Sequence, residues 1–165
     1  MEALIEQLKR HEGSKKDKNG NHILYKDTVD KWTCGYGRNL SDVGISEDEA
    51  LYLLRNDIDK ARRNLSKWLP WTEMLDRVRY EVLVNMTFNM GIGGLLQFKN
   101  TLKLIKESKY KEASIEMLKS RWAKQVGSRA IELSKQMKTG EYKRSTTTRY
   151  KPVACSSNSH KGGLR

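Results

Sequence analysis

Residues 77–90 carry apolar side chains on every side of a predicted helix, and this feature constrains the fold more than any other part of the chain. Asp76 precedes the stretch as a typical helix N-cap, and Gly91 follows it. The apolar positions leave no continuous polar face: Val78, Val82, Leu83, Val84, Met86, Phe88 and Met90. Because a helix that is apolar all round is buried, we expect the centre of the main core here, with other helices packed around it.

Most of the remaining chain also has helical periodicity. Ser46 and Glu49 form a capping-box pattern at the start of a long helix, which we expect to run to about residue 65. The last predicted helix has Ser128 as its expected cap and stops at Gly140. The other predicted helices cover residues 2–11, 98–108 and 110–120. The chain is therefore expected to be mostly helical.

The region before residue 46 contains the convincing β-structure. Residues 14–22 are polar and hold an Asn-Gly turn signal, whereas 22–27 and 31–37 read as short strands around a turn at Val29 and Asp30. We therefore predict an α+β protein with one domain over residues 1–142. Its expected parts are a small β-hairpin lobe (about 14–45), a linking helix (about 46–65) and a larger helical lobe (about 70–142).

The charge is strongly positive and uneven. The formal net charge is +12, and residues 143–165 hold six of the 32 Lys and Arg residues with no acid. We expect this segment to be a flexible basic tail, and the charge favours polyanions such as the bacterial envelope. No membrane span and no signal peptide are predicted, because apolar runs of the required length are missing from the sequence. Synthesis in a cytoplasm follows as an expectation.

Glu12 and Asp27 are the candidate reacting groups. Each lies beside a predicted rigid element, and Thr33 follows in the second strand. Glycoside hydrolysis uses two carboxyl groups, one protonated to donate to the leaving oxygen and one ionised to activate water or meet the developing cation. The chemistry alone is a weak signal, since a Glu and Asp pair is common.

The letters around these residues resemble the catalytic opening of the phage-type lysozymes, the muramidases of glycoside hydrolase family 24. The matching motifs are HEG, YKDT and WTCGYGRNL, which contain Glu12, Asp27 and Thr33. The resemblance implies a lysozyme-like fold, with Glu12 as general acid, Asp27 as the group that orients or activates water, and Thr33 as its hydroxyl partner.

The resemblance extends over residues 1–142 in the same order. GISEDEALYLLRNDI is similar to the family's interlobe helix, LVNMTFNMGIGGLLQFKNTL to its buried central helix, and KSRWAKQVGSRA to its Ser-Arg-Trp segment. By position it implies that Phe88 and Thr101 contact the glycan, that Gln125 lies near the cleft, and that Arg129 supports the catalytic Glu. We group these four as expected substrate-binding residues.

The sequence departs from the family pattern at four places. The interval between Glu12 and Asp27 is longer than usual, so KKDKNGNH (residues 15–22) resembles an insertion in the first hairpin, which either lengthens the substrate rim or displaces Asp27. Asp30 replaces a common turn Gly; Asp tolerates a left-handed backbone. Arg38 replaces a His, and Cys34 an apolar residue.

The resemblance implies a monomeric, inverting glycoside hydrolase that cuts the β-1,4 bond between N-acetylmuramic acid and N-acetylglucosamine in peptidoglycan glycan strands. It also suggests a bacteriophage endolysin, made in the host cytoplasm and released to the wall through a pore-forming holin to cause host lysis. No cofactor and no metal are expected, because His22 and His160 lack metal-ligand spacing.

Two other functions are consistent with the same residues. A non-catalytic cationic module would bind peptidoglycan or nucleic acid without creating reducing ends, although no nucleic-acid recognition motif is present in the sequence. A lytic transglycosylase would use Glu12 but needs no water-activating carboxylate, so it would leave anhydro-muramic ends and survive loss of Asp27.

Overall fold

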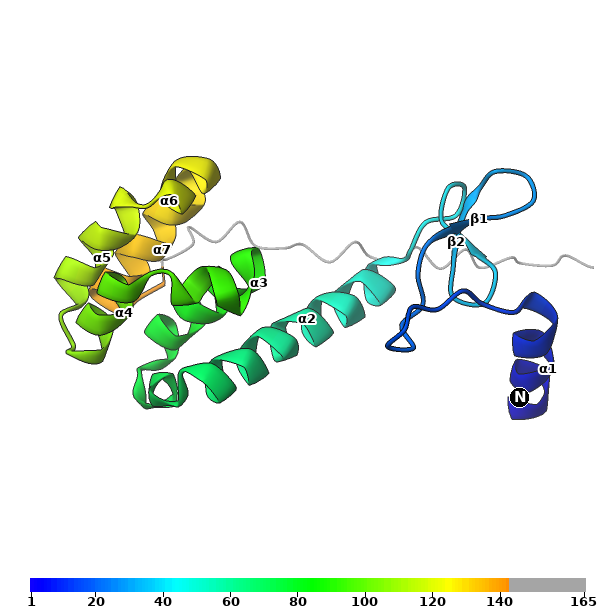
Figure 1. Ribbon diagram of the computed structural model, residues 1–165, viewed down its shortest axis with the longest axis horizontal. Coiled ribbons are helices and arrows are strands. Elements are labelled where there is room, and N and C mark those ends of the chain that lie inside the picture. Colours follow the sequence, from blue (N-terminus) through cyan, green and yellow to red (C-terminus); the bar gives the residue numbers. More distant parts are fainter. Residues whose placement is uncertain (143–165) are drawn as a thin grey trace, which may run out of the picture. The chain divides into compact units, whose positions relative to one another are not determined.

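The computed structural model describes residues 1–142, so the predicted basic tail lies outside the described residues. The chain divides into two compact units, with the boundary between Asn64 and Leu65 inside the long helix α2 (Figure 1). The first unit carries the strands and the second is helical. The α+β fold class predicted from the sequence is confirmed.

The first unit contains helix α1 (Glu2–Glu12), a small antiparallel sheet and the part of α2 up to Asn64. The strands are β1 (Tyr25–Lys26), β2 (Trp32–Cys34) and β3 (Arg38–Asn39), with β2 in the middle. The first two strands lie within the predicted ones, whereas β3 was not predicted. Among residues 1–60, Thr33 alone is buried, and the apolar residues of the core begin at Ala61.

Helix α2 (Glu47–Trp68) starts at the predicted capping box. The Ser46 amide donates to Glu49 Oε2 at 2.7 Å, and the Glu49 amide donates back to Ser46 Oγ at 3.3 Å. The helix ends before Pro70, which opens the short 3-10 helix η1 (Pro70–Met74). Proline fits the first turn of a helix because its missing N–H has no partner there.

Helix α3 (Arg77–Leu96) is the predicted central helix, and the Asp76 side chain caps it by accepting from the Arg79 amide at 3.1 Å. Its path kinks at Gly91, where φ is +72°. The largest fully buried apolar side chains confirm that the core lies in this unit: Leu65, Leu83, Met86, Leu95, Ile105, Met117 and Met137. Phe88 differs from the expectation of an all-round buried helix, because 42% of it is exposed.

Four further helices complete the second unit: α4 (Lys99–Lys106), α5 (Tyr110–Lys119), α6 (Arg121–Val126) and α7 (Ser128–Thr139). Helix α5 packs against both α4 and α7 (Figure 1). The prediction that Ser128 caps α7 was wrong. The helix begins at Ser128 itself after Gly127, whose left-handed φ of +55° turns the chain. The predicted stop at Gly140 is confirmed by a left-handed residue there.

Arg79 connects the start of α3 to the end of α7. Its Nε donates to the Met137 carbonyl at 2.8 Å and its Nη2 to the Lys138 carbonyl at 3.2 Å. The guanidinium also lies 3.8 Å from the ring centroid of Tyr110 on α5. The last carbonyls of a helix lack partners within the helix, so this side chain satisfies groups that would otherwise need water. Within residues 1–142, no helix is both long and apolar enough to cross a membrane.

Candidate active site

Glu12 is the last residue of α1, and its carboxylate lies against the backbone of Gly37. The helix stops because Gly13 takes a φ of +63°, while its amide still donates to the Lys9 carbonyl at 3.1 Å. A β-carbon placed on Gly37 would be 2.8 Å from Glu12 Oε2. Any other residue at position 37 would therefore have to push the carboxylate away. The Glu12 side chain is exposed.

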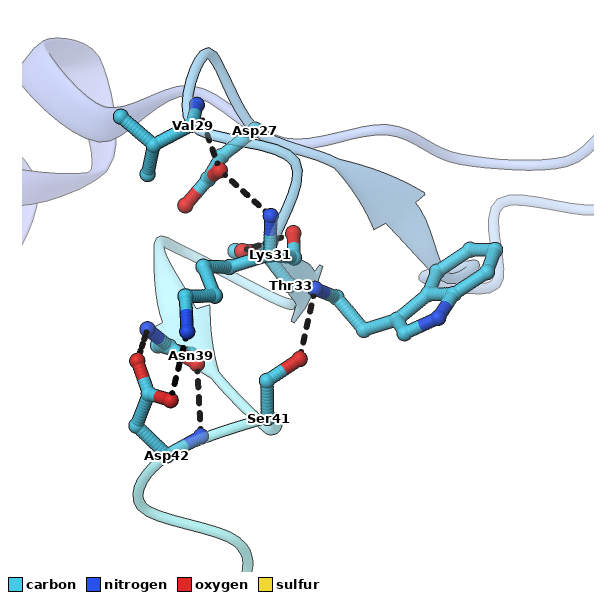
Figure 2. Close-up of polar contacts among 8 residues, drawn as sticks. Asp27, Val29, Lys31, Thr33, Asn39, Ser41 and Asp42 are labelled. Atoms are coloured by element: carbon cyan, nitrogen blue, oxygen red, sulfur yellow. Dashed lines mark hydrogen bonds and ion pairs between the residues drawn. The ribbon is translucent and has the colours of Figure 1, made fainter.

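Asp27 organises the turn between β1 and β2. Its Oδ1 accepts the amides of Val29 and Lys31, each at 2.9 Å (Figure 2). The turn also places Asp30 at a φ of +64°, the left-handed conformation that Asp was expected to tolerate there. Within residues 1–142, the second carboxylate oxygen of Asp27, Oδ2, has no hydrogen-bond partner. One oxygen thus fixes the turn and the other is available to a ligand or water.

Thr33 lies in β2 and is the buried residue of the sheet, with 4% of its surface exposed. Its hydroxyl donates to the Lys31 carbonyl at 3.3 Å (Figure 2). The Thr33 hydroxyl thus bonds to the turn that Asp27 holds. In the antiparallel register Thr33 is opposite Tyr25, so the two side chains are on the same face of the sheet.

These three predicted residues line one hollow of about 460 Å³ in the first unit. We refer to it as the carboxylate hollow, and its lining residues are Glu12, Lys15, Tyr25, Lys26, Asp27, Thr28, Thr33 and Gly37. All of them belong to the stretch from the end of α1 to the turn after β2. The lining includes the carboxylates of Glu12 and Asp27 and the hydroxyl groups of Tyr25, Thr28 and Thr33. Despite the longer interval between them in the sequence, Glu12 and Asp27 line the same hollow.

Residues 15–22, the segment expected to be an insertion, form a hairpin beside the hollow. Lys16 and His22 form an isolated antiparallel bridge, and the Ile23 amide donates to the Lys15 carbonyl at 3.0 Å. Asp17 closes the tip by accepting from the amides of Asn19 at 2.8 Å and Asn21 at 2.9 Å. The hydrogen bonds from Asn21, followed by those from Asn19, hold the pKa of Asp17 below its ordinary value.

Sequence reasoning did not identify Lys15 or Tyr25 as part of the site. The Lys15 ammonium lies 5.2 Å from the centroid of the Tyr25 ring, within the usual range of a cation–π contact. The position of Lys15 just after the helix terminator Gly13 was the available signal, because a residue two positions beyond Gly13 stays close to Glu12. The direction of the Lys15 side chain depends on the geometry of the hairpin, and the amino-acid sequence alone does not define that geometry.

The four expected substrate-binding residues lie in the second unit and have different environments. Arg129 is held by Asn85, whose Oδ1 accepts from Nε at 2.9 Å and from Nη2 at 2.7 Å. Phe88 and Gln125 are exposed, whereas Thr101 is 96% buried and lines a hollow near the start of α4. Asn85 was not predicted as a site residue. The available signal was its amide side chain, one helical turn before a second amide, Asn89, on the mostly apolar helix α3.

The part of the chain that the structure describes holds no group of three or more His, Cys, Asp or Glu residues arranged to bind a metal ion.

Comparison with known proteins gives consistent matches. The family model described as phage lysozyme matches residues 10–143, a range that includes all seven expected site residues. A Dictyostelium discoideum protein named "Probable T4-type lysozyme 1" is 28% identical over 171 residues, covering 85% of this chain and 96% of that protein. "Probable T4-type lysozyme 2" from the same organism is also 28% identical, over 87% of this chain and 98% of its own length. The similarity thus spans nearly the whole of both relatives.

Proposed function

Because the chain belongs to the phage lysozyme family, we propose that it hydrolyses the β-1,4 bond between N-acetylmuramic acid and N-acetylglucosamine in bacterial peptidoglycan. The observation that carries this proposal is the common hollow of Glu12, Asp27 and Thr33 in the first unit. Two carboxylates from separate elements meet there beside a hydroxyl, which is the set that glycoside hydrolysis needs.

Glu12 is the proposed general acid. It lies at the end of a helix against Gly37, where the missing side chain leaves room for the carboxyl group itself. Since Glu12 is exposed, we propose that the bound glycan shields its carboxyl group from water and so keeps the acid protonated. Proton donation to the leaving oxygen would then follow binding.

Asp27 is the proposed water-activating group. Its Oδ1 is fixed by two backbone amides, so Oδ2 has a defined direction for accepting a hydrogen bond from water. Thr33 donates its proton to the Lys31 carbonyl and keeps lone pairs that can accept from the same water. We propose an inverting reaction, in which water held by Asp27 and Thr33 attacks the anomeric carbon from the side opposite the leaving group, as the resemblance to the phage-type lysozymes implies.

We further propose that Phe88, Thr101, Gln125 and Arg129 bind the glycan. Arg129 has the best-defined geometry, because Asn85 fixes two of its guanidinium nitrogens and leaves its remaining N–H groups to a ligand. The net charge of +12 would concentrate such an enzyme, acting as a monomer, at an anionic wall.

The proposed setting is a phage endolysin that is made in the bacterial cytoplasm and reaches the wall through a pore formed by a holin. The two relatives come from a cellular organism, and this favours a second setting, in which the same chemistry operates outside phage lysis. Expression in a bacterium with and without a holin gene separates these settings. Lysis that requires the holin supports the endolysin role.

The test of the reaction is digestion of purified peptidoglycan by the wild type and by Glu12→Gln, with mass analysis of the sugar ends. Hydrated reducing muramic ends from the wild type alone are expected. Anhydro-muramic ends would identify a transglycosylase instead. If both proteins bind to the wall and neither cleaves it, the protein is a non-catalytic binding module. Near-normal turnover by Glu12→Gln would refute its assignment as the acid.

A further inference from the structure

Lys15 projects over the face of the sheet that lines the carboxylate hollow. Tyr25 and Thr33 are directly opposite each other in the antiparallel register, so their side chains share one face. Thr33 lines the hollow, and the Lys15 ammonium lies 5.2 Å from the Tyr25 ring centroid. The cation is therefore on the same face as the hollow.

The hairpin of residues 15–23 fixes this placement. The Lys15 carbonyl accepts from the Ile23 amide, and the Asp17 side chain closes the tip through Asn19 and Asn21. These hydrogen bonds fix the position of the Lys15 backbone, and the side chain extends from it to the Tyr25 ring. Residues 15–23 thus place a cation at the hollow that Glu12 and Asp27 also line.

Within residues 1–142, no carboxylate lies within ion-pair distance (4.0 Å) of the Lys15 ammonium. Lys26 differs, although it also lines the hollow: its ammonium is 2.8 Å from Asp30 Oδ1 and 5.0 Å from the Trp32 ring centroid. Lys26 and Trp32 are an opposing pair in the register, one position away from Tyr25 and Thr33, so they occupy the other face of the sheet. Among the described residues, Lys15 is thus the lysine of the hollow that has a cation–π contact but no carboxylate partner.

We propose that Lys15 is a specificity-determining residue that binds a carboxylate of the peptidoglycan. This inference rests on the proposed function and deepens it by naming the substrate group. The carboxylate belongs either to the stem peptide or to the lactyl group of a muramic residue without a stem. An uncompensated ammonium at the rim of a sugar-binding hollow attracts such a group and repels cationic substituents.

The experiment compares the wild type with Lys15→Gln and with the conservative Lys15→Arg. Lys18→Gln is the matched control, because Lys18 is an exposed lysine of the same hairpin that does not line the hollow. Three substrates are used: intact peptidoglycan, the same material with its carboxylates converted to amides, and glycan strands whose stems have been removed by an amidase. KM and kcat come from the release of reducing ends, and sedimentation of Glu12→Gln with and without Lys15→Gln measures binding alone.

We expect Lys15→Gln to raise KM on intact peptidoglycan about two- to fivefold with kcat unchanged, the effect of losing one solvent-exposed ion pair. Lys15→Arg and Lys18→Gln should match the wild type. The difference should vanish on the amidated substrate, and also at about 1 M salt, where the Debye length is about 3 Å. An effect that persists on stem-free strands identifies the lactyl carboxylate, and an effect lost there identifies the stem.

An equal loss on native and amidated peptidoglycan would overturn the proposal, as would an equal effect of Lys18→Gln. If the wild type releases no reducing ends, the proposed reaction fails, but the sedimentation comparison still decides whether Lys15 binds the carboxylate. The two failures are therefore distinguishable.

Discussion

Glu12 and Gly37 are so close that a β-carbon on Gly37 would lie 2.8 Å from Glu12 Oε2. Real β-carbons do not approach oxygen this closely, so one of the two residues must move if position 37 gains a side chain. A glycine in the turn after β2 thus sets the position of a carboxylate at the end of α1.

Gly37→Ala should reduce turnover strongly, because it displaces the proposed acid. A misplacement of about 1 Å can lower the rate by about 100-fold. Gly35→Ala is the matched control: both glycines have a positive φ (+65° and +80°), but no atom lies within 4 Å of a β-carbon on Gly35. Each substitution costs about 1–2 kcal/mol of stability for the left-handed backbone. Equal turnover in the two variants, measured below their melting temperatures, would show that the contact with Glu12 does not matter.

Asp27→Asn should separate the two roles of this side chain, which are to fix the turn and to activate water. Asparagine keeps an oxygen for the Val29 and Lys31 amides, so stability should change by less than about 0.5 kcal/mol. Turnover should fall by about 100- to 10,000-fold, because the general base is lost. Asp27→Ala should lose the turn as well, at about 1–2 kcal/mol, measured by denaturant unfolding. Wild-type turnover by Asp27→Asn would point to a transglycosylase.

Arg79→Met should destabilise the second unit by about 1–3 kcal/mol, since the Met137 and Lys138 carbonyls lose their donors and the Tyr110 ring loses its cation. Arg77→Met is the control. That side chain is 84% exposed and pairs with Glu81, so its loss should change stability by less than about 1 kcal/mol. Urea unfolding of both variants gives the comparison, and equal losses would contradict the role given to Arg79.

Alkaline pH should weaken the fold through Tyr142. Burial, the hydrogen bond to Glu81 and the charge of Glu81 raise the pKa of this phenol from 10.0 to about 12. The folded state therefore holds the proton more tightly than the unfolded chain, and the contribution to stability is present below pH 10 and lost as the pH rises towards 12. Unfolding free energy should fall more steeply over this window in the wild type than in Tyr142→Phe. If the unfolding free energy of the two proteins falls equally with pH, the raised pKa of Tyr142 is refuted.

The parts of the fold that local chemistry determines were predictable from the sequence. The capping pair of Ser46 and Glu49, the Asp76 cap and the stop at Gly140 depend on a few neighbouring residues, and all are present. The left-handed backbone of Asp30 was also expected. In the candidate site, the resemblance of HEG, YKDT and WTCGYGRNL to the phage-type lysozymes identified the stretch that holds Glu12, Asp27 and Thr33, and these residues line one hollow.

The missed features depend on pairing or packing between separate segments. Strand β3 is two residues long and exists because Arg38 and Asn39 pair with β2, which no periodicity can show. Ser128 is a residue type that commonly caps helices, but Gly127 turns the chain so that the helix starts at Ser128 itself, one residue earlier than a Ser128 cap would require. The exposure of Phe88 depends on which face of α3 the other helices leave open. The place of Lys15 in the hollow depends on the geometry of the hairpin, which the sequence does not show.

Thr33 is the single buried residue before Ala61, whereas the second unit holds the apolar core. The segment that carries the proposed chemistry thus has little packing to lose when its loops change length. Changes in the length or charge of hairpin 15–22 should therefore cost little free energy of unfolding, whereas truncation of the buried apolar side chains after Ala61 should cost much more.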